Sequence, residues 1–85
     1  MLVERRLVAC VNSVPVQSCY RWNGEFCSEP ENLRIAKTKE PLKTEVIAAI
    51  WLLYIYEIPE IIAVPVSAGY APYLAWVHAE TMDEI

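Results

Sequence analysis

Histidine and glycine are scarce in this chain of 85 residues, which has one histidine and two glycines. Phosphate-binding loops and nucleophile elbows both need closely spaced glycines. Neither motif occurs in the sequence, and the H-E-x-x-H pair of zinc proteases is also missing. A cysteine–histidine nucleophile pair would have to use His78, which has no supporting motif around it. We therefore predict that the protein is not an enzyme.

Lysine and arginine are missing from the second half of the chain. All seven lie in residues 1–43 beside five acids, which gives +2, whereas residues 44–85 carry six acids and no base, which gives −6. Such a half offers no counter-charge to a phosphate backbone, and the sequence pI of about 4.8 is far below that of a typical nucleic-acid-binding domain. Nucleic acid is therefore disfavoured as a partner. The acids either keep an apolar half soluble or meet a basic surface.

Cysteine occurs three times, an odd number that excludes a complete set of intramolecular disulfides. The stretch 1–12 interrupts its apolar residues with charged ones, unlike a secretory signal. Both observations predict an intracellular, reducing (cytoplasmic) location with free thiols. A zinc site would have to combine Cys10, Cys19, Cys27 and His78. Because the cysteines form no C-x2–4-C pair, we predict neither a metal nor any other cofactor.

An Asn-Gly pair at residues 23–24 is the clearest structural signal, because both residue types tolerate the positive φ of a tight hairpin turn. It follows an alternating segment at 16–22 that is typical of a strand. A two-residue turn here would place Tyr20 opposite Cys27. The returning strand is expected to be short and to cover residues 25–27.

The remaining segments complete a predicted α+β fold, a single domain over residues 1–85. Pro41 suits the first turn of a helix, and Pro59 should end it. The expected order is β-β-β-α-β-β, a small antiparallel sheet with one central helix packed on it. In chain order, the elements are strands over 2–11, 16–22 and 25–27, a polar connection over 28–40, a helix over 41–57, and strands over 60–66 and 73–79.

The run VIAAIWLLYIY at residues 46–56 is uncharged throughout. It is much shorter than the roughly 20 residues that a membrane helix needs, so a membrane is disfavoured as a partner. On a helical wheel both sides of the 41–57 helix are apolar, although a single sheet covers only one of them. Trp51, Leu52 and Ile55 therefore need another cover. The alternatives are the chain's own connection or tail, a second copy, or a different protein.

Two acids, Glu57 and Glu60, follow this apolar face and bracket the end of the predicted helix. We expect partner binding through Trp51, Leu52 and Ile55, with the two acids contacting basic groups. The favoured function is a small, non-catalytic protein-binding module. We expect a stoichiometric inhibitor or adaptor of viral or mobile-element type that acts on a larger protein, such as a nucleic-acid-binding one. The alternative is a homodimeric structural or small-ligand-binding protein.

Overall fold

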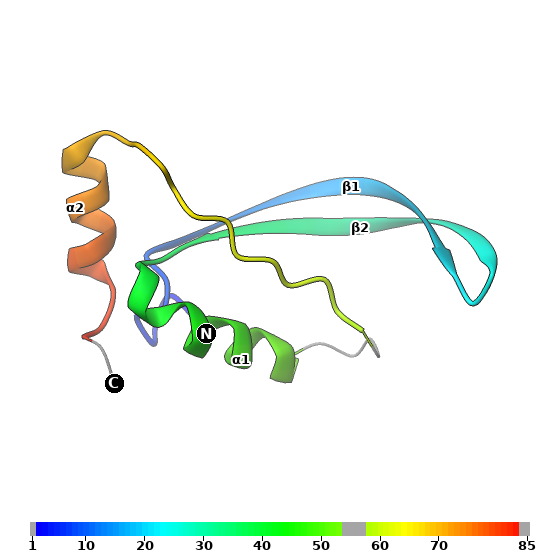
Figure 1. Cartoon of the computed structure of the whole chain (residues 1–85), viewed down its shortest axis with the longest axis horizontal. Coiled ribbons are helices and arrows are strands. Elements are labelled where there is room, and N and C mark those ends of the chain that lie inside the picture. Colours follow the sequence, from blue (N-terminus) through cyan, green and yellow to red (C-terminus); the bar gives the residue numbers. More distant parts are fainter. Residues whose placement is uncertain (1, 54–57, 84–85) are drawn as a thin grey trace.

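The computed structural model describes residues 2–53 and 58–83, and it confirms a small α+β architecture with an antiparallel sheet. Figure 1 shows a long hairpin that projects away from the helices. None of the helices among these residues is long and apolar enough to cross a bilayer. In chain order, the described elements are strand β1 (Cys10–Trp22), strand β2 (Glu25–Lys37), the 3-10 turn η1 (Glu40–Leu42), helix α1 (Lys43–Leu53) and helix α2 (Ala71–Glu80).

The hairpin turn lies where the sequence predicts it. Asn23 has a φ of 52° and Gly24 a φ of 78°, the left-handed conformation that an Asn-Gly pair tolerates. The register places Tyr20 opposite Cys27, as predicted. The Asn-Gly turn depends only on neighbouring residues, and its position and two-residue length set the register of the two strands.

The two strands are longer than predicted. Strand β1 runs straight through Pro15, where a turn was expected, and β2 continues to Lys37 through most of the predicted connection over 28–40. Pro15 lies opposite Asn32 and Pro30 opposite Gln17. Because the described sheet has two strands, each is an edge strand, and edge strands tolerate a proline without an N–H.

The predicted strand over residues 2–11 is wrong for most of its length. Residues 2–6 form turns, in which the Arg6 N–H donates to the Val3 carbonyl and the Leu7 N–H to the Leu2 carbonyl, both at 3.0 Å. The physical reason lies in Leu7 and Val8, which are 3% and 1% exposed. Neighbouring residues of a strand point to opposite faces, so a turn is needed to bury both on the same side.

Helix α1 begins close to the predicted position. Pro41 lies in the 3-10 turn that leads into it, and Leu42 is fully buried. The predicted end of the helix falls in residues 54–57, outside the described residues.

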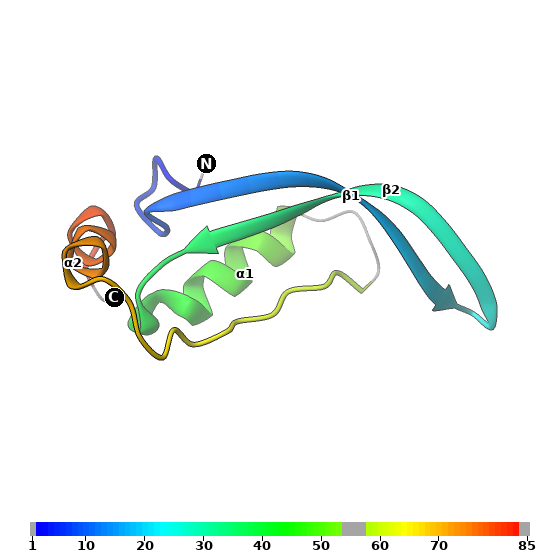
Figure 2. The same cartoon turned by 90° about the horizontal axis from the view of Figure 1, so that it is seen from above.

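The predicted strands over 60–66 and 73–79 are also wrong. Residues 60–66 belong to a stretch without helix or strand, which Figure 2 shows in yellow running back past α1 toward α2. Residues 73–79 lie within α2, so the described residues contain two α-helices instead of one. Pro72 occupies the first turn of α2, where its missing N–H costs little. Tyr73 and Val77 alternate as in a strand, but their spacing of four also places them on one helical face.

A small core joins the N-terminal turn to α1. Leu7, Val8, Leu42 and Val46 form one buried cluster at the base of the hairpin. The Thr38 hydroxyl donates to the Leu7 carbonyl at 2.6 Å and ties the end of β2 to the same cluster. Further apolar side chains pack against it, namely Leu2, Val11, Ala49, Ile50 and Met82.

Arg6 anchors α2 to this core. Its guanidinium donates to the Ala79 carbonyl through Nη2 at 2.7 Å and to the Glu80 carbonyl through Nε at 3.2 Å. These are carbonyls of the last helical turn, which lack partners within the helix. The Arg6 carbonyl in turn accepts from the Met82 N–H at 2.7 Å. Arg6 holds this position with a φ of 60°, which is unusual for arginine.

Candidate interaction surfaces

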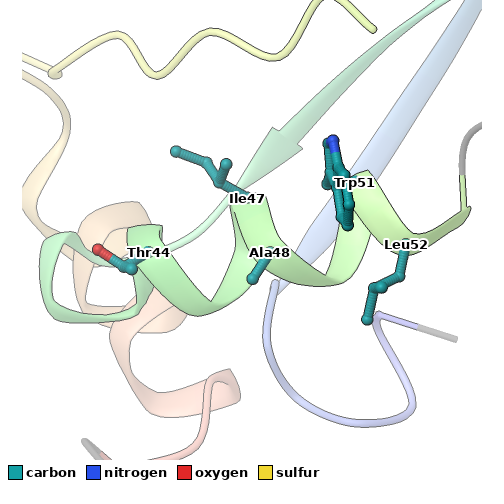
Figure 3. Close-up of a pocket in the computed structure, with 5 residues that line it drawn as sticks. All are labelled: Thr44, Ile47, Ala48, Trp51 and Leu52. Atoms are coloured by element: carbon teal, nitrogen blue, oxygen red, sulfur yellow. The ribbon is translucent and has the colours of Figure 1, made fainter. Parts of the chain in front are cut away.

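The outer face of α1 is apolar and open to solvent. Trp51 is 60% exposed and Leu52 is 75% exposed, so the described part of the chain does not enclose them. A shallow hollow of about 500 Å³ lies on this face. In Figure 3, Ile47 and Trp51 project to one side of the helix and Leu52 to the other. We call this surface the α1 face. It is lined by Thr44, Ile47, Ala48, Trp51 and Leu52.

The predicted partner-binding residues fall into two groups. Trp51 and Leu52 lie together on the α1 face. Glu60 is exposed in the stretch that begins at residue 58, while Ile55 and Glu57 lie outside the described residues. A second, smaller hollow of about 210 Å³ joins the helix to the N-terminal turn, and it is lined by Leu2, Arg5, Ala49, Leu52 and Leu53.

The hairpin carries a second apolar surface. Val11 packs against the core. Because residues alternate along a strand, Val14 and Val16 share one side of β1. This is the side away from Val11. Leu33 pairs directly with Val14, and Ile35 shares its side of β2. We call these four residues the open sheet face, and they are 36–51% exposed.

Sequence reasoning missed the open sheet face, because residues 28–40 were interpreted as a polar connection. The signal was present in the alternation of Leu33, Arg34 and Ile35, which is typical of a strand with one apolar side. Pro30 and the surrounding acids obscured it.

The outer half of the hairpin carries a group of side-chain hydrogen bonds between its two strands. The Tyr20 hydroxyl donates to the Glu29 carboxylate at 2.5 Å, and this hydrogen bond, with a smaller effect of desolvation, raises the pKa of Tyr20 to about 12. Nearby, Ser28 Oγ accepts from Gln17 Nε2 at 3.0 Å and lies 3.6 Å from Cys19 Sγ. These contacts stiffen the arm but gather no nucleophile with a base.

The candidate metal ligands do not come together. Cys10, Cys19 and Cys27 lie along the hairpin as free thiols, whereas His78 lies on α2. Across residues 2–53 and 58–83, no three His, Cys, Asp or Glu side chains are grouped so as to hold a metal ion. The described residues of one chain therefore do not fit a resident metal centre.

Comparison with known proteins decides the family. Residues 1–80 match the profile of a family described as CutA1 divalent ion tolerance protein. The chain belongs to the CutA1 family. It is 41% identical over 81 residues to mouse Protein CutA, covering 94% of this chain and 46% of the mouse protein. It is also 41% identical to the divalent-cation tolerance protein CutA of Thermus thermophilus, covering 94% of this chain and 79% of that protein.

Solved CutA structures share the fold. The PII-like protein CutA from Nostoc sp. PCC 7120 superposes with a TM-score of 0.91 at 38% identity, over 95% of this chain and 80% of that one. By contrast, the CutA1-family chain described here spans just under half of the length of the mouse and Arabidopsis relatives.

The family membership corrects two predictions. A viral or mobile-element inhibitor is wrong, because the CutA relatives come from animals, plants and bacteria and the matching family is described as CutA1 divalent ion tolerance protein. The findings favour the alternative, a homodimeric structural or small-ligand-binding protein, over the inhibitor. The predicted cytoplasmic location is not established for a CutA1-family chain, since one relative is named chloroplastic and another periplasmic.

Proposed function

We propose that this CutA1-family chain is a subunit of a homo-oligomer. In this proposal, the oligomer contributes to divalent-cation tolerance by binding a small ligand and not by catalysis. The name of the Thermus relative supports the cation-tolerance role. The lack of any grouped nucleophile and base among the described residues supports the non-catalytic reading.

The observation that supports an oligomer is the large solvent-accessible surface of one chain. The accessible surface is 6927 Å². A compact 9.7 kDa monomer should expose only about 5,100 Å². These residues therefore expose about 1,800 Å² more than a compact chain of the same mass, and the projecting hairpin contributes to this excess. The radius of gyration, 14.9 Å, likewise exceeds the about 12 Å of a compact domain of this length.

The open sheet face is the surface that a second copy covers in this proposal. Its four apolar residues lie on two neighbouring strands and form a continuous patch. They are Val14, Val16, Leu33 and Ile35. Burial of each side chain contributes roughly 1.5–3 kcal/mol when it is complete, so half-exposed residues leave about half of this free energy to be gained on association.

The test is the molar mass in solution, measured by light scattering at protein concentrations from about 1 to about 100 µM. We expect a multiple of 9.7 kDa for the wild-type chain. Leu33→Glu places a charge in the open sheet face and should lower this mass. Phe26→Glu is the matched control, because Phe26 is a 73% exposed apolar residue near the hairpin turn, outside the patch.

A second measurement addresses cation tolerance. Cells that lack their own CutA should regain growth in elevated copper(II) or zinc(II) when they express the wild-type chain, and Leu33→Glu should reduce this rescue. A wild-type chain that stays at 9.7 kDa throughout the concentration series contradicts the oligomer. An oligomer that gives no rescue contradicts the tolerance role.

A further inference from the structure

We propose that residues 60–66 and the outer edge of β2 form the two sides of a strand-binding site. We call it the strand site. Its ligand is one extended, uncharged peptide segment from outside residues 1–85, which enters between the two sides and pairs with both through its backbone. The inference does not depend on the homo-oligomer, because it uses backbone groups and not the side chains of the open sheet face.

Residues 58–69 run extended without a backbone partner. None of their N–H or C=O groups forms a hydrogen bond with the backbone of another described residue. Three apolar side chains of this stretch, Ile62, Val64 and Val66, are 71–78% exposed. They are spaced two residues apart, which places them on one face of an extended chain. The stretch therefore has the composition of a strand and lacks a neighbouring strand to pair with.

Strand β2 also has an edge that is unpaired within the described sheet. Because this sheet has two strands, every second residue of β2 points its N–H and C=O away from β1. In Figure 2 the yellow stretch that begins at residue 58 lies on the β2 side of the hairpin and runs in the same direction as β2. No backbone hydrogen bond joins the two among the described residues. Two parallel edges on one side of the molecule are thus both open.

The order of the elements explains why these edges do not pair with each other. Strand β2, helix α1 and residues 60–66 follow one another as a β-α-β unit, in which the two extended segments are parallel. The solved CutA structures that this chain matches have a ferredoxin-like fold. In the β-α-β-β-α-β order of that fold, another strand splits the β-α-β unit. The strand site is the position of that other strand.

The ligand strand corresponds to the first strand of the ferredoxin-like order. Strands β1 and β2, helix α1 and residues 60–66 supply the last four elements of that order, and the first strand has no counterpart among residues 2–53 and 58–83. About a fifth of the Nostoc CutA chain lies outside the match, since this chain covers 80% of it. That remainder is long enough to supply a strand of five or six residues, the usual length of a strand, here about 20 Å.

The direction of the ligand strand follows from the same order. Strands joined by a helical crossover are parallel, so the first strand is parallel to β1. Because β1 and β2 are antiparallel, the ligand strand is antiparallel to β2 and to residues 60–66. Its side chains lie beside Ile62, Val64 and Val66, which favours apolar, β-branched residues. A strand that is paired on both edges needs all of its N–H groups, which excludes an internal proline.

Pro65 indicates which edge of residues 60–66 takes part. Proline has no N–H, so a strand tolerates it only where that position faces away from the neighbouring strand. Hydrogen-bonding groups alternate along a strand, so with Pro65 on the outer edge the N–H groups of Ile62, Val64 and Val66 lie on the inner edge. The inner edge is therefore the one that can pair with the ligand strand.

The first test adds the strand as a separate peptide to the 85-residue chain. The probe is a synthetic peptide with the sequence of the first strand of Thermus thermophilus CutA. Its matched control is N-methylated at every second residue, which keeps the side chains and removes the backbone donors along one edge. We expect the probe to slow hydrogen exchange in residues 60–66 and in β2, and the control to bind at least about tenfold more weakly. Absence of protection at about 1 mM probe, or equal binding of the two peptides, overturns the inference.

Proline substitutions test the inner edge. Val64→Pro removes an inner donor and should weaken binding of the probe at least about tenfold, whereas Ala63→Pro removes an outer donor and should change it by less than about twofold. Val64→Ala keeps the N–H and controls for the lost side chain. Both positions are exposed and make no backbone hydrogen bond with the described residues, so circular dichroism should show an unchanged fold. Equal effects of the two prolines overturn the inference.

A second copy is the competing occupant. Protection of residues 60–66 in the chain alone at about 100 µM and not at about 1 µM means that another copy fills the strand site, and this result overturns the peptide as its ligand. Leu33→Glu changes the open sheet face and should leave binding of the probe unchanged, because the probe pairs with backbone groups. Failure of the homo-oligomer and failure of this inference are therefore read separately.

Discussion

Replacing Arg6 separates two opposing effects that this residue has on stability. Its guanidinium binds two carbonyls at the end of α2, while its backbone adopts a φ of 60° that strains a residue with a Cβ. Arg6→Ala removes the two hydrogen bonds and keeps the strain. Arg6→Gly removes the hydrogen bonds and the strain together.

The magnitudes follow from the structure. Hydrogen bonds to a charged group contribute about 1.5–3 kcal/mol each when they are buried, and the exposure of this pair reduces the total to about 1–2 kcal/mol. The left-handed conformation costs about 1 kcal/mol for alanine and almost nothing for glycine. We therefore expect Arg6→Ala to lower the free energy of unfolding by about 1–2 kcal/mol. Arg6→Gly should retain about 0.5–1 kcal/mol more stability than Arg6→Ala.

The assay is urea unfolding followed by circular dichroism at one fixed protein concentration, because self-association makes apparent stability depend on concentration. Hydrogen exchange of the last turn of α2 adds a local readout, and both variants should speed it. Arg6→Gly would normally be the less stable of the two replacements, since glycine loses more backbone entropy on folding. If it proves so here, the argument from backbone strain is refuted.

Two further predictions concern Tyr20 and Leu42. The pKa of Tyr20 is raised to about 12 from an unfolded value of 10.0, so its stabilising effect is fully present below pH 10 and is lost between about pH 10 and 12. Tyrosinate absorbance should show one late-titrating tyrosine that disappears in Tyr20→Phe, and an unchanged titration curve would contradict the hydrogen bond to Glu29. Leu42→Ala should lower the free energy of unfolding by about 2–5 kcal/mol, because the side chain is fully buried. Leu53→Ala, at a residue that is 56% exposed, should cost much less, and equal losses in urea unfolding would contradict this placement of the core.

The parts of the fold that sequence reasoning predicted correctly are those set by local chemistry. Asn23 and Gly24 fix the hairpin turn and its register, and Pro41 marks the start of a helix. The length of β2 could not be predicted in this way. Residues 28–37 are polar and contain Pro30, and only their pairing with β1 keeps them extended.

Alternation alone misled at both ends of the chain. Near the N-terminus the core needs Leu7 and Val8 on the same side, so tertiary packing overrides the strand pattern. Near the C-terminus the segment 73–79 fits both the two-residue period of a strand and the 3.6-residue period of a helix. Pro72 was the signal that a helix begins there.

The α1 face could be predicted in part, because missing charges on a helix are visible in the sequence. The exposure of Trp51 and Leu52 agrees with that expectation, and their role in binding stays a prediction. The open sheet face depended on β2 and was missed for the same reason that β2 was. The inhibitor hypothesis failed because composition and charge describe a class of surface and do not identify a family.

The hairpin reaches far beyond the residues that stabilise it. Thirteen residues per strand span about 40 Å, while the buried cluster lies at one end of that length. In an isolated chain the outer half of this arm has only its own ladder, its turn and a few side-chain hydrogen bonds to keep it ordered. Local opening should become easier from base to tip, as a gradient of amide protection would record. Neighbouring copies that pack on the arm would level this gradient, so that dissociation and melting of the tip become one event.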